Sequence, residues 1–296
     1  MAAPAHAKVP ERLASVAGRS LIFGLGWAPL IWYTLFLLGP LLLVLATSLA
    51  TRGVYGGIQW TLTFENFHRA FDFLYVQVFF RSLWLATFTA VLCMAIGFPM
   101  ALAMATSSKS VRNLFVLFLA VPFLTNLIIR ICALKALTAT DGPLEEMLST
   151  LHIPHDPFSL SQNMPLVMFG MISTYLPFMV FPLYGALERF DFSLVEAAQD
   201  LGATYYQVLT RVLLPGLRRA IASAVLLVFI PALGEFVIPD LLGGAKTMLS
   251  GNLISEQFLK SRDWPFGSAL SVILIVLLSL AILVINHVGG KEPVND

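Results

Sequence analysis

The sequence predicts an all-α membrane protein with six transmembrane helices. The 296-residue chain is 58% hydrophobic and only 12% charged, whereas soluble domains contain about 25% charged residues. Six stretches also come close to or exceed the about 20 apolar residues that a helix needs to cross a bilayer. Each is expected to be helical because backbone polar groups inside a membrane must be paired within the segment.

The predicted spans share long apolar runs and cover residues 24–50, 82–105, 114–137, 165–187, 221–238 and 267–288. The first span is free of charge from Ser20 to Thr51, which is too long for the about 7–15 residue core of a signal peptide. We therefore expect a retained helix. The third and fifth spans are unusual because they contain Arg130, Lys135 and Glu235.

The distribution of basic residues predicts the orientation of these spans. Basic residues concentrate in four segments, at Lys8, Arg12 and Arg19, at Lys109 and Arg112, at Arg189, Arg211, Arg218 and Arg219, and at Lys291. Loop 138–164 instead carries Asp141, Glu145, Glu146 and Asp156 without Lys or Arg. By the positive-inside rule both termini and loop 188–220 are cytoplasmic. The expected organisation is a cytoplasmic segment 1–20, a membrane domain 21–290 that includes this loop, and a cytoplasmic tail 291–296.

Proline occurs in five of the six predicted spans, at positions 29, 40, 99, 122, 177, 182 and 231. Each proline removes a backbone donor and bends its helix, which a membrane tolerates where neighbouring helices or a water-lined cavity repair the loss. Together the prolines favour bent helices around a transport pathway.

Several classes of function are not supported by the sequence. A net charge of +1 provides no basic surface for nucleic acid, and no G-x-x-x-x-G-K-[ST] motif for ATP is present. His152 and His155 are separated by Pro154 and are expected to be a solvated loop pair without a complete metal-ligand set. Cys93 and Cys132 lie in apolar spans, where we expect them to be unpaired.

Loop 188–220 has signals for two short helices. Ser193 and Glu196 have the spacing of a capping box, and Leu194, Ala197, Ala198 and Leu201 recur at helical spacing. Gly202 supplies the positive φ that ends a helix. Thr204 is then expected to cap a second helix that runs to about Leu213 and is stopped by Pro215.

The same loop resembles the signature of permease subunits of binding-protein-dependent ABC importers. The matching residues are Glu196, Ala197, Ala198, Gly202, Leu214 and Pro215, with Val212 in place of the usual Ile. The resemblance implies a type I ABC importer permease fold, in which the first helix of the loop docks on an ATP-hydrolysing subunit. It also implies an ATP-binding subunit dimer that holds ATP and Mg, a second related permease, an extracytoplasmic solute-binding protein and surrounding membrane lipid.

Three further segments, 122–130, 231–244 and 262–269, resemble the spermidine/putrescine permeases, and the similarity runs from about Trp27 to the sixth span. It implies a polyamine cargo. The pattern departs from that family at Leu124, Leu127, Ile131 and Cys132, so a different small solute is the alternative. An ion-driven carrier or a channel is the alternative from another class.

Arg130, Glu235 and Asp240 are the candidate pathway or gate residues, because ionisable groups are costly inside a membrane. Lys135 and Asp240 are close enough to the outer interface to reach it. Two interpretations remain open for the deeper residues. Arg130 and Glu235 form an interhelical ion pair, or Glu235 lines the pathway and attracts a cation.

Overall fold

The computed structural model describes residues 27, 29–53, 56–140, 142–151, 162–244 and 247–289. This part of the chain is almost entirely helical, apart from a short antiparallel hairpin formed by β1 (Thr51–Arg52) and β2 (Ile58–Gln59). The predicted terminal segments 1–20 and 291–296 lie outside the described residues, as do Asp141, His152, His155 and Asp156.

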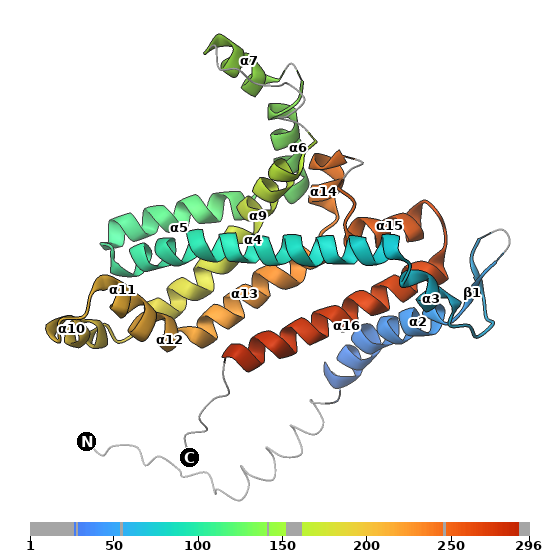
Figure 1. Cartoon of the computed structure of the whole chain (residues 1–296), viewed down its shortest axis with the longest axis horizontal. Coiled ribbons are helices and arrows are strands. Elements are labelled where there is room, and N and C mark those ends of the chain that lie inside the picture. Colours follow the sequence, from blue (N-terminus) through green and yellow to red (C-terminus); the bar gives the residue numbers. More distant parts are fainter. Residues whose placement is uncertain are drawn as a thin grey trace, which may run out of the picture.

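The helices follow one another along the chain as shown in Figure 1. They are η1 (Thr34–Leu38), α2 (Gly39–Ser48), α3 (Glu65–Ala70), α4 (Phe73–Thr106), α5 (Lys109–Leu124), α6 (Leu127–Leu137), α7 (Pro143–Thr150), α9 (Met164–Leu187), α10 (Ser193–Asp200), α11 (Tyr205–Val208), η2 (Leu209–Leu213), α12 (Leu214–Gly216), α13 (Arg218–Leu233), α14 (Val237–Leu242), α15 (Ser250–Leu259) and α16 (Trp264–Gly289). The two η elements are π-helical turns.

Four helical stretches are long and apolar enough to cross a membrane: Pro29–Ser48, Phe73–Thr106, Met164–Leu187 and Trp264–His287. Two bent pairs bring the number of candidate spans in the described residues to as many as six. Lys109–Leu124 and Leu127–Leu137 meet at 93°, and Tyr205–Gly216 and Arg218–Leu233 meet at 74°. The second predicted span is longer than expected, because α4 begins at Phe73.

The spans predicted over 114–137 and 221–238 are interrupted and do not form single continuous helices. The third span breaks between α5 and α6, where Asn126 leaves the helical conformation and its side chain accepts hydrogen bonds from the backbone N–H groups of Ile128 and Ile129. The fifth breaks between the end of α13 at Leu233 and the start of α14 at Val237. Side-chain caps of this kind stabilise a helix end and allow the chain to change direction.

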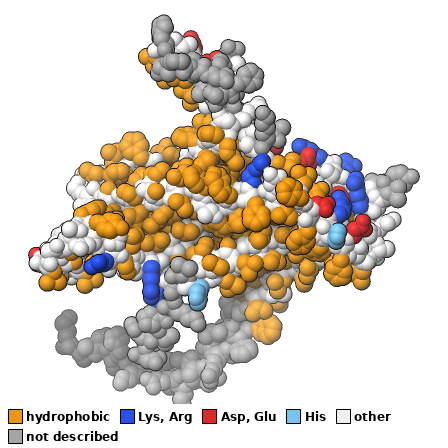
Figure 2. Space-filling view, in the orientation of Figure 1, with side chains coloured by type: hydrophobic (Ala, Val, Ile, Leu, Met, Phe, Trp, Pro, Cys, Tyr) orange, Lys and Arg blue, Asp and Glu red, His pale blue; other side chains and the backbone are white. Residues whose placement is uncertain are grey.

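The core of the protein lies where α4, α9 and α13 pack together. Its fully buried side chains include Leu85, Met104, Met179 and Leu183. Helix α16 packs on α13 and carries α2 on its other side. Hydrophobic side chains cover most of the face shown in Figure 2, which is the surface that lipid requires of a membrane protein.

The helical loop lies at one end of the long axis, opposite α3, α15 and the hairpin (Figure 1). Helices α10, α11 and α12 lie at one end, close to the connection between α4 and α5, and α3, α15 and the hairpin lie at the other. The second helix of the loop continues as η2 and α12 past Pro215 to Gly216. A π turn fits here because Pro215 has no N–H to donate to an α-helical ladder.

Candidate functional site

Glu235 closes the break between α13 and α14. Its Oε1 accepts hydrogen bonds from the backbone N–H groups of Val237 at 2.9 Å and Ile238 at 3.3 Å. Its Oε2 accepts a hydrogen bond from the hydroxyl of Tyr175 on α9 at 2.5 Å. The side chain is buried. The carboxylate therefore satisfies the unpaired donors at the start of α14 and stands at the positive end of that short helix.

Arg130 performs the complementary task at the break between α5 and α6. Its Nη1 donates to the carbonyl oxygen of Pro122 at 2.6 Å, and its Nη2 donates to the hydroxyl oxygen of Thr174 on α9 at 3.0 Å. Pro122 lies in the last turn of α5, where carbonyl groups have no partner within the helix. A guanidinium group at this negative end of the helix is favourable.

Arg130 and Glu235 do not form the ion pair that was one of the two interpretations. In the described part of the chain the salt bridges join Arg69 to Asp263 at 3.2 Å and Arg112 to Glu188 at 3.4 Å. The half-buried Arg130 and the buried Glu235 instead bind backbone groups at helix breaks. The partners on α9, Thr174 and Tyr175, were not singled out from the sequence. The signal was the hydroxyl run Ser173, Thr174 and Tyr175 within an apolar span.

The beginning of α15 holds the break between α13 and α14 from the other side. The Ser250 hydroxyl donates to the Leu233 carbonyl at 3.0 Å, and the Asn252 amide donates to the Phe236 carbonyl at 2.8 Å. Gly251 lies between them, and a Cβ atom there would be 2.5 Å from the Gly234 oxygen. Only glycine permits so close an approach of the two backbones.

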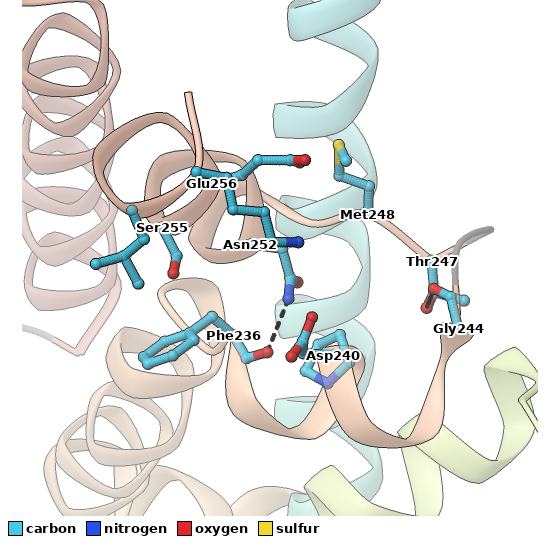
Figure 3. A pocket seen from close by; sticks show the side chains of 11 residues that line it. Phe236, Asp240, Gly244, Thr247, Met248, Asn252, Ser255 and Glu256 are labelled. Carbon is cyan, nitrogen blue, oxygen red and sulfur yellow. Dashed lines mark hydrogen bonds between the residues drawn. The ribbon is translucent and has the colours of Figure 1, made fainter. Parts of the chain in front are cut away.

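A cavity of about 540 Å³ opens beside this break, between α14 and α15. Figure 3 shows Asp240 of α14 and Asn252, Ser255 and Glu256 of α15 along its wall, with Phe236 beneath them. Lys260 also lines it. Of the three candidate pathway residues only Asp240 lines this cavity. The described residues contain no group of three or more His, Cys, Asp or Glu side chains that could hold a metal ion.

The helical loop between α9 and α13 contains the expected turn at Gly202, but its first helix is not capped as expected. Gly202 has a φ of +80°, and the Gly202 and Ala203 N–H groups bind the Gln199 and Ala198 carbonyls at 2.8 Å and 3.0 Å, which is a Schellman motif. Thr204 forms a capping box with Gln207 at the start of α11.

The predicted capping box of Ser193 and Glu196 does not form. The N-cap residue of α10 is Phe192, whose side chain makes no capping hydrogen bond, and Ser193 is the first residue of the helix. Asp191, two residues before Ser193, supplies the side-chain acceptor at the start of α10. Its Oδ1 accepts a hydrogen bond from the Ser193 N–H at 3.0 Å. Hydrogen bonds from the Ser193 side chain and backbone lower the pKa of the Asp191 carboxyl. This contribution to the loop is therefore present at neutral pH and is lost as the pH falls through the lowered pKa.

One side of α10 packs against its own chain and the other is free. Val195 and Ala198 contact the hydrophobic core, whereas Leu194, Glu196 and Ala197 are exposed. Leu201 is 89% exposed. The predicted apolar face thus points away from the protein except at Ala198. At the end of the loop Leu214 is half-buried and Pro215 is exposed.

Apolar helices with two capped breaks and a protruding helical loop define a membrane transport permease. The chain matches the model of the family described as binding-protein-dependent transport system inner membrane component over residues 94–289, and it belongs to that family. It is the membrane component of a transport system and is not itself the catalytic subunit. The resemblance expected from the Glu196–Pro215 motif is confirmed.

Similar proteins support this assignment over most of the chain. The spermidine/putrescine transport system permease protein PotB of Escherichia coli is 40% identical over 253 residues, covering 86% of this chain and 92% of the relative. PotB of Haemophilus influenzae is 42% identical and covers 86% and 88%. A bacterial ABC transporter that imports alginate shares the fold with a TM-score of 0.73, 20% identity and coverage of 95% and 98%.

The capping role of Glu235 leads to a test. Glu235→Ala leaves buried N–H groups unpaired, at a cost of about 1–3 kcal/mol each, and we expect a clearly lower melting temperature of the purified protein in detergent. Glu235→Gln keeps an acceptor oxygen and should melt close to the native protein. If Gln were as damaging as Ala, the negative charge and not the acceptor would be the essential property.

Proposed function

We propose that the chain is a permease subunit of an ATP-driven importer of polyamines such as spermidine and putrescine. The observation that carries this proposal is the 40–42% identity to spermidine/putrescine permeases over 86% of the chain. The family match over residues 94–289 includes both helix breaks and loop 188–220, which are the segments that we propose to take part in transport.

The proposed assembly contains an extracytoplasmic solute-binding protein, a second related permease and a dimer of ATP-binding subunits that hold ATP and Mg. The family name supports a binding-protein partner. Two bent pairs in addition to four continuous helices support six membrane crossings. In this proposal the protein lies in the inner membrane of a bacterium, with both termini in the cytoplasm. Arg211, Arg218 and Arg219 lie within the loop 188–220, which supports placing it on the cytoplasmic side.

The exposed face of α10 is the proposed contact with the ATP-binding subunit. Leu194, Ala197 and Leu201 present apolar surface, and Glu196 offers a charge-assisted contact. The Schellman turn at Gly202 and the capping box at Thr204 fix α10 on the rest of the loop. Closure of the ATP-binding subunits is thus transmitted through Leu214 and Pro215 to α13, and the breaks at Arg130 and Glu235 serve as hinges during alternating access.

A cationic cargo agrees with the cavity between α14 and α15. Asp240 and Glu256 contribute two carboxylates against the single ammonium of Lys260, and Phe236 adds an aromatic face. Such a combination attracts and packs an alkyl-ammonium chain. In this proposal Asp240 lines the outer entrance of the pathway, and Glu235 shapes that entrance from behind without contacting solute.

The function is tested by ATP hydrolysis of the purified complex in lipid with its binding protein. Spermidine, putrescine and a neutral sugar are compared, and we expect stimulation by a polyamine alone. Stimulation by another solute would contradict the polyamine cargo but would still support an ATP-driven importer. Failure of any ATP-hydrolysing subunit to co-purify would reject the importer in favour of a carrier or channel.

Gly202→Asp is expected to separate ATP hydrolysis from transport. Any side chain at φ +80° costs about 1 kcal/mol of backbone strain and redirects α10. We expect strongly reduced polyamine uptake with normal membrane insertion. Gly57→Asp is the matched control, because Gly57 has a φ of +87° in the hairpin at the opposite end. Equal uptake in the two variants would contradict the coupling role.

Asp240→Asn combined with Glu256→Gln is expected to weaken cargo capture without unfolding the protein. A partly exposed charge contact contributes about 0.2–1 kcal/mol, which corresponds to a rise of roughly 1.4- to fivefold in the half-saturating polyamine concentration per charge. Glu65→Gln, an exposed acid of α3 that does not line the cavity, provides the control. Identical half-saturation in all three proteins would remove the cavity from the pathway.

A further inference from the structure

Helix α9 presents two adjacent hydroxyl groups to two different helix breaks. Successive residues of an α-helix point about 100° apart, so Thr174 and Tyr175 face different neighbours. The Thr174 oxygen accepts from Arg130 of α6 at 3.0 Å, and the Tyr175 hydroxyl donates to Glu235 between α13 and α14 at 2.5 Å. Each hydroxyl thus holds the charged side chain that closes one break.

Both hydroxyl groups are set in place by burial and local bonding. Thr174 is 9% exposed and Tyr175 is 5% exposed. Thr174 donates its own proton to the Gly170 carbonyl at 2.8 Å, which leaves its lone pairs for Arg130. A buried polar group without its partner is costly, so neither contact is readily exchanged for solvent.

The segments that follow the two breaks also pack together on α9. A Cβ atom at Gly170 would lie 2.9 Å from a Leu242 methyl and 3.0 Å from an Ile238 methyl of α14, and 3.7 Å from an Ile131 methyl of α6. Gly170 is one helical turn before Thr174. Helices α6 and α14 therefore meet at the same short stretch of α9 that holds Arg130 and Glu235.

One donor at this junction has no partner in the arrangement seen. The Nε of Arg130 is buried and has no hydrogen-bond acceptor within the described residues. Buried donors without acceptors are rare and costly in a settled core.

We propose that Tyr175, together with Thr174, is a positioning residue that links the two helix breaks, so that α6 and α14 change position together. Alternating access then involves one movement of a joined α6–α9–α14 unit and not two independent bends. In this respect the inference rests on the proposed import function. The mechanical link itself is a property of the folded chain and is measurable without cargo or ATP.

The test is hydrogen–deuterium exchange of backbone amides in the detergent-purified chain. Tyr175→Phe removes only the hydroxyl that binds Glu235, and Thr174→Val removes only the acceptor for Arg130. We expect each variant to accelerate exchange at both breaks, around Ile128–Ile129 and around Val237–Ile238, by roughly threefold or more. Thr174→Ser restores the hydroxyl and should restore protection at both places.

Ser173→Ala is the matched control on the same helix, because Ser173 donates only to the Gly170 carbonyl of its own turn. It should leave both breaks protected. Faster exchange confined to the break next to the altered residue, in both variants, would overturn the link. A chain that shows linked exchange while its complex is stimulated by no solute would contradict the proposed function and leave the link standing.

Discussion

The requirement that every buried backbone polar group be paired is the constraint on which this structure depends. A continuous transmembrane helix meets it alone, whereas a broken helix exposes donors on one side of the break and acceptors on the other. Arg130 donates to the Pro122 carbonyl at the end of α5, which also accepts from the Thr125 hydroxyl, and Glu235 accepts from two N–H groups at the start of α14. Each break is stable because a polar side chain pairs backbone groups that the break exposes.

The same requirement explains why α9 and α15 are essential to the site. Thr174 and Tyr175 each hydrogen-bond one of the two charged groups, and Ser250 and Asn252 donate to carbonyls on either side of Gly234. The two helix breaks are therefore held in one conformation by side chains of α9 and α15. This junction, which is held by a few hydrogen bonds and not by a full helical ladder, is the hinge that we propose for the permease.

Local features were predictable from the sequence and long-range closures were not. Gly202 and Thr204 were identified correctly because their signals involve only the neighbouring turn. Ser193 was mistaken for a cap because Asp191 competes from two residues away. The positions of the breaks were not predicted, although the Asn126 cap between α5 and α6 is local. Arg130 and Glu235 were singled out by their charge, but their partners Thr174 and Tyr175 are distant in sequence, and only the packing of α6, α9 and α14 shows which group binds which.

The claim that the capped breaks are the hinges of the permease is tested most directly by a distance measurement across one of them. Spin labels at the exposed positions Leu117 of α5 and Leu137 of α6 report their separation by pulsed electron paramagnetic resonance in the complete transporter. If the break is a hinge, the distance distribution is expected to change when ATP, Mg and loaded binding protein are added. The same distribution with and without them would contradict it, because the break would then be a fixed bend.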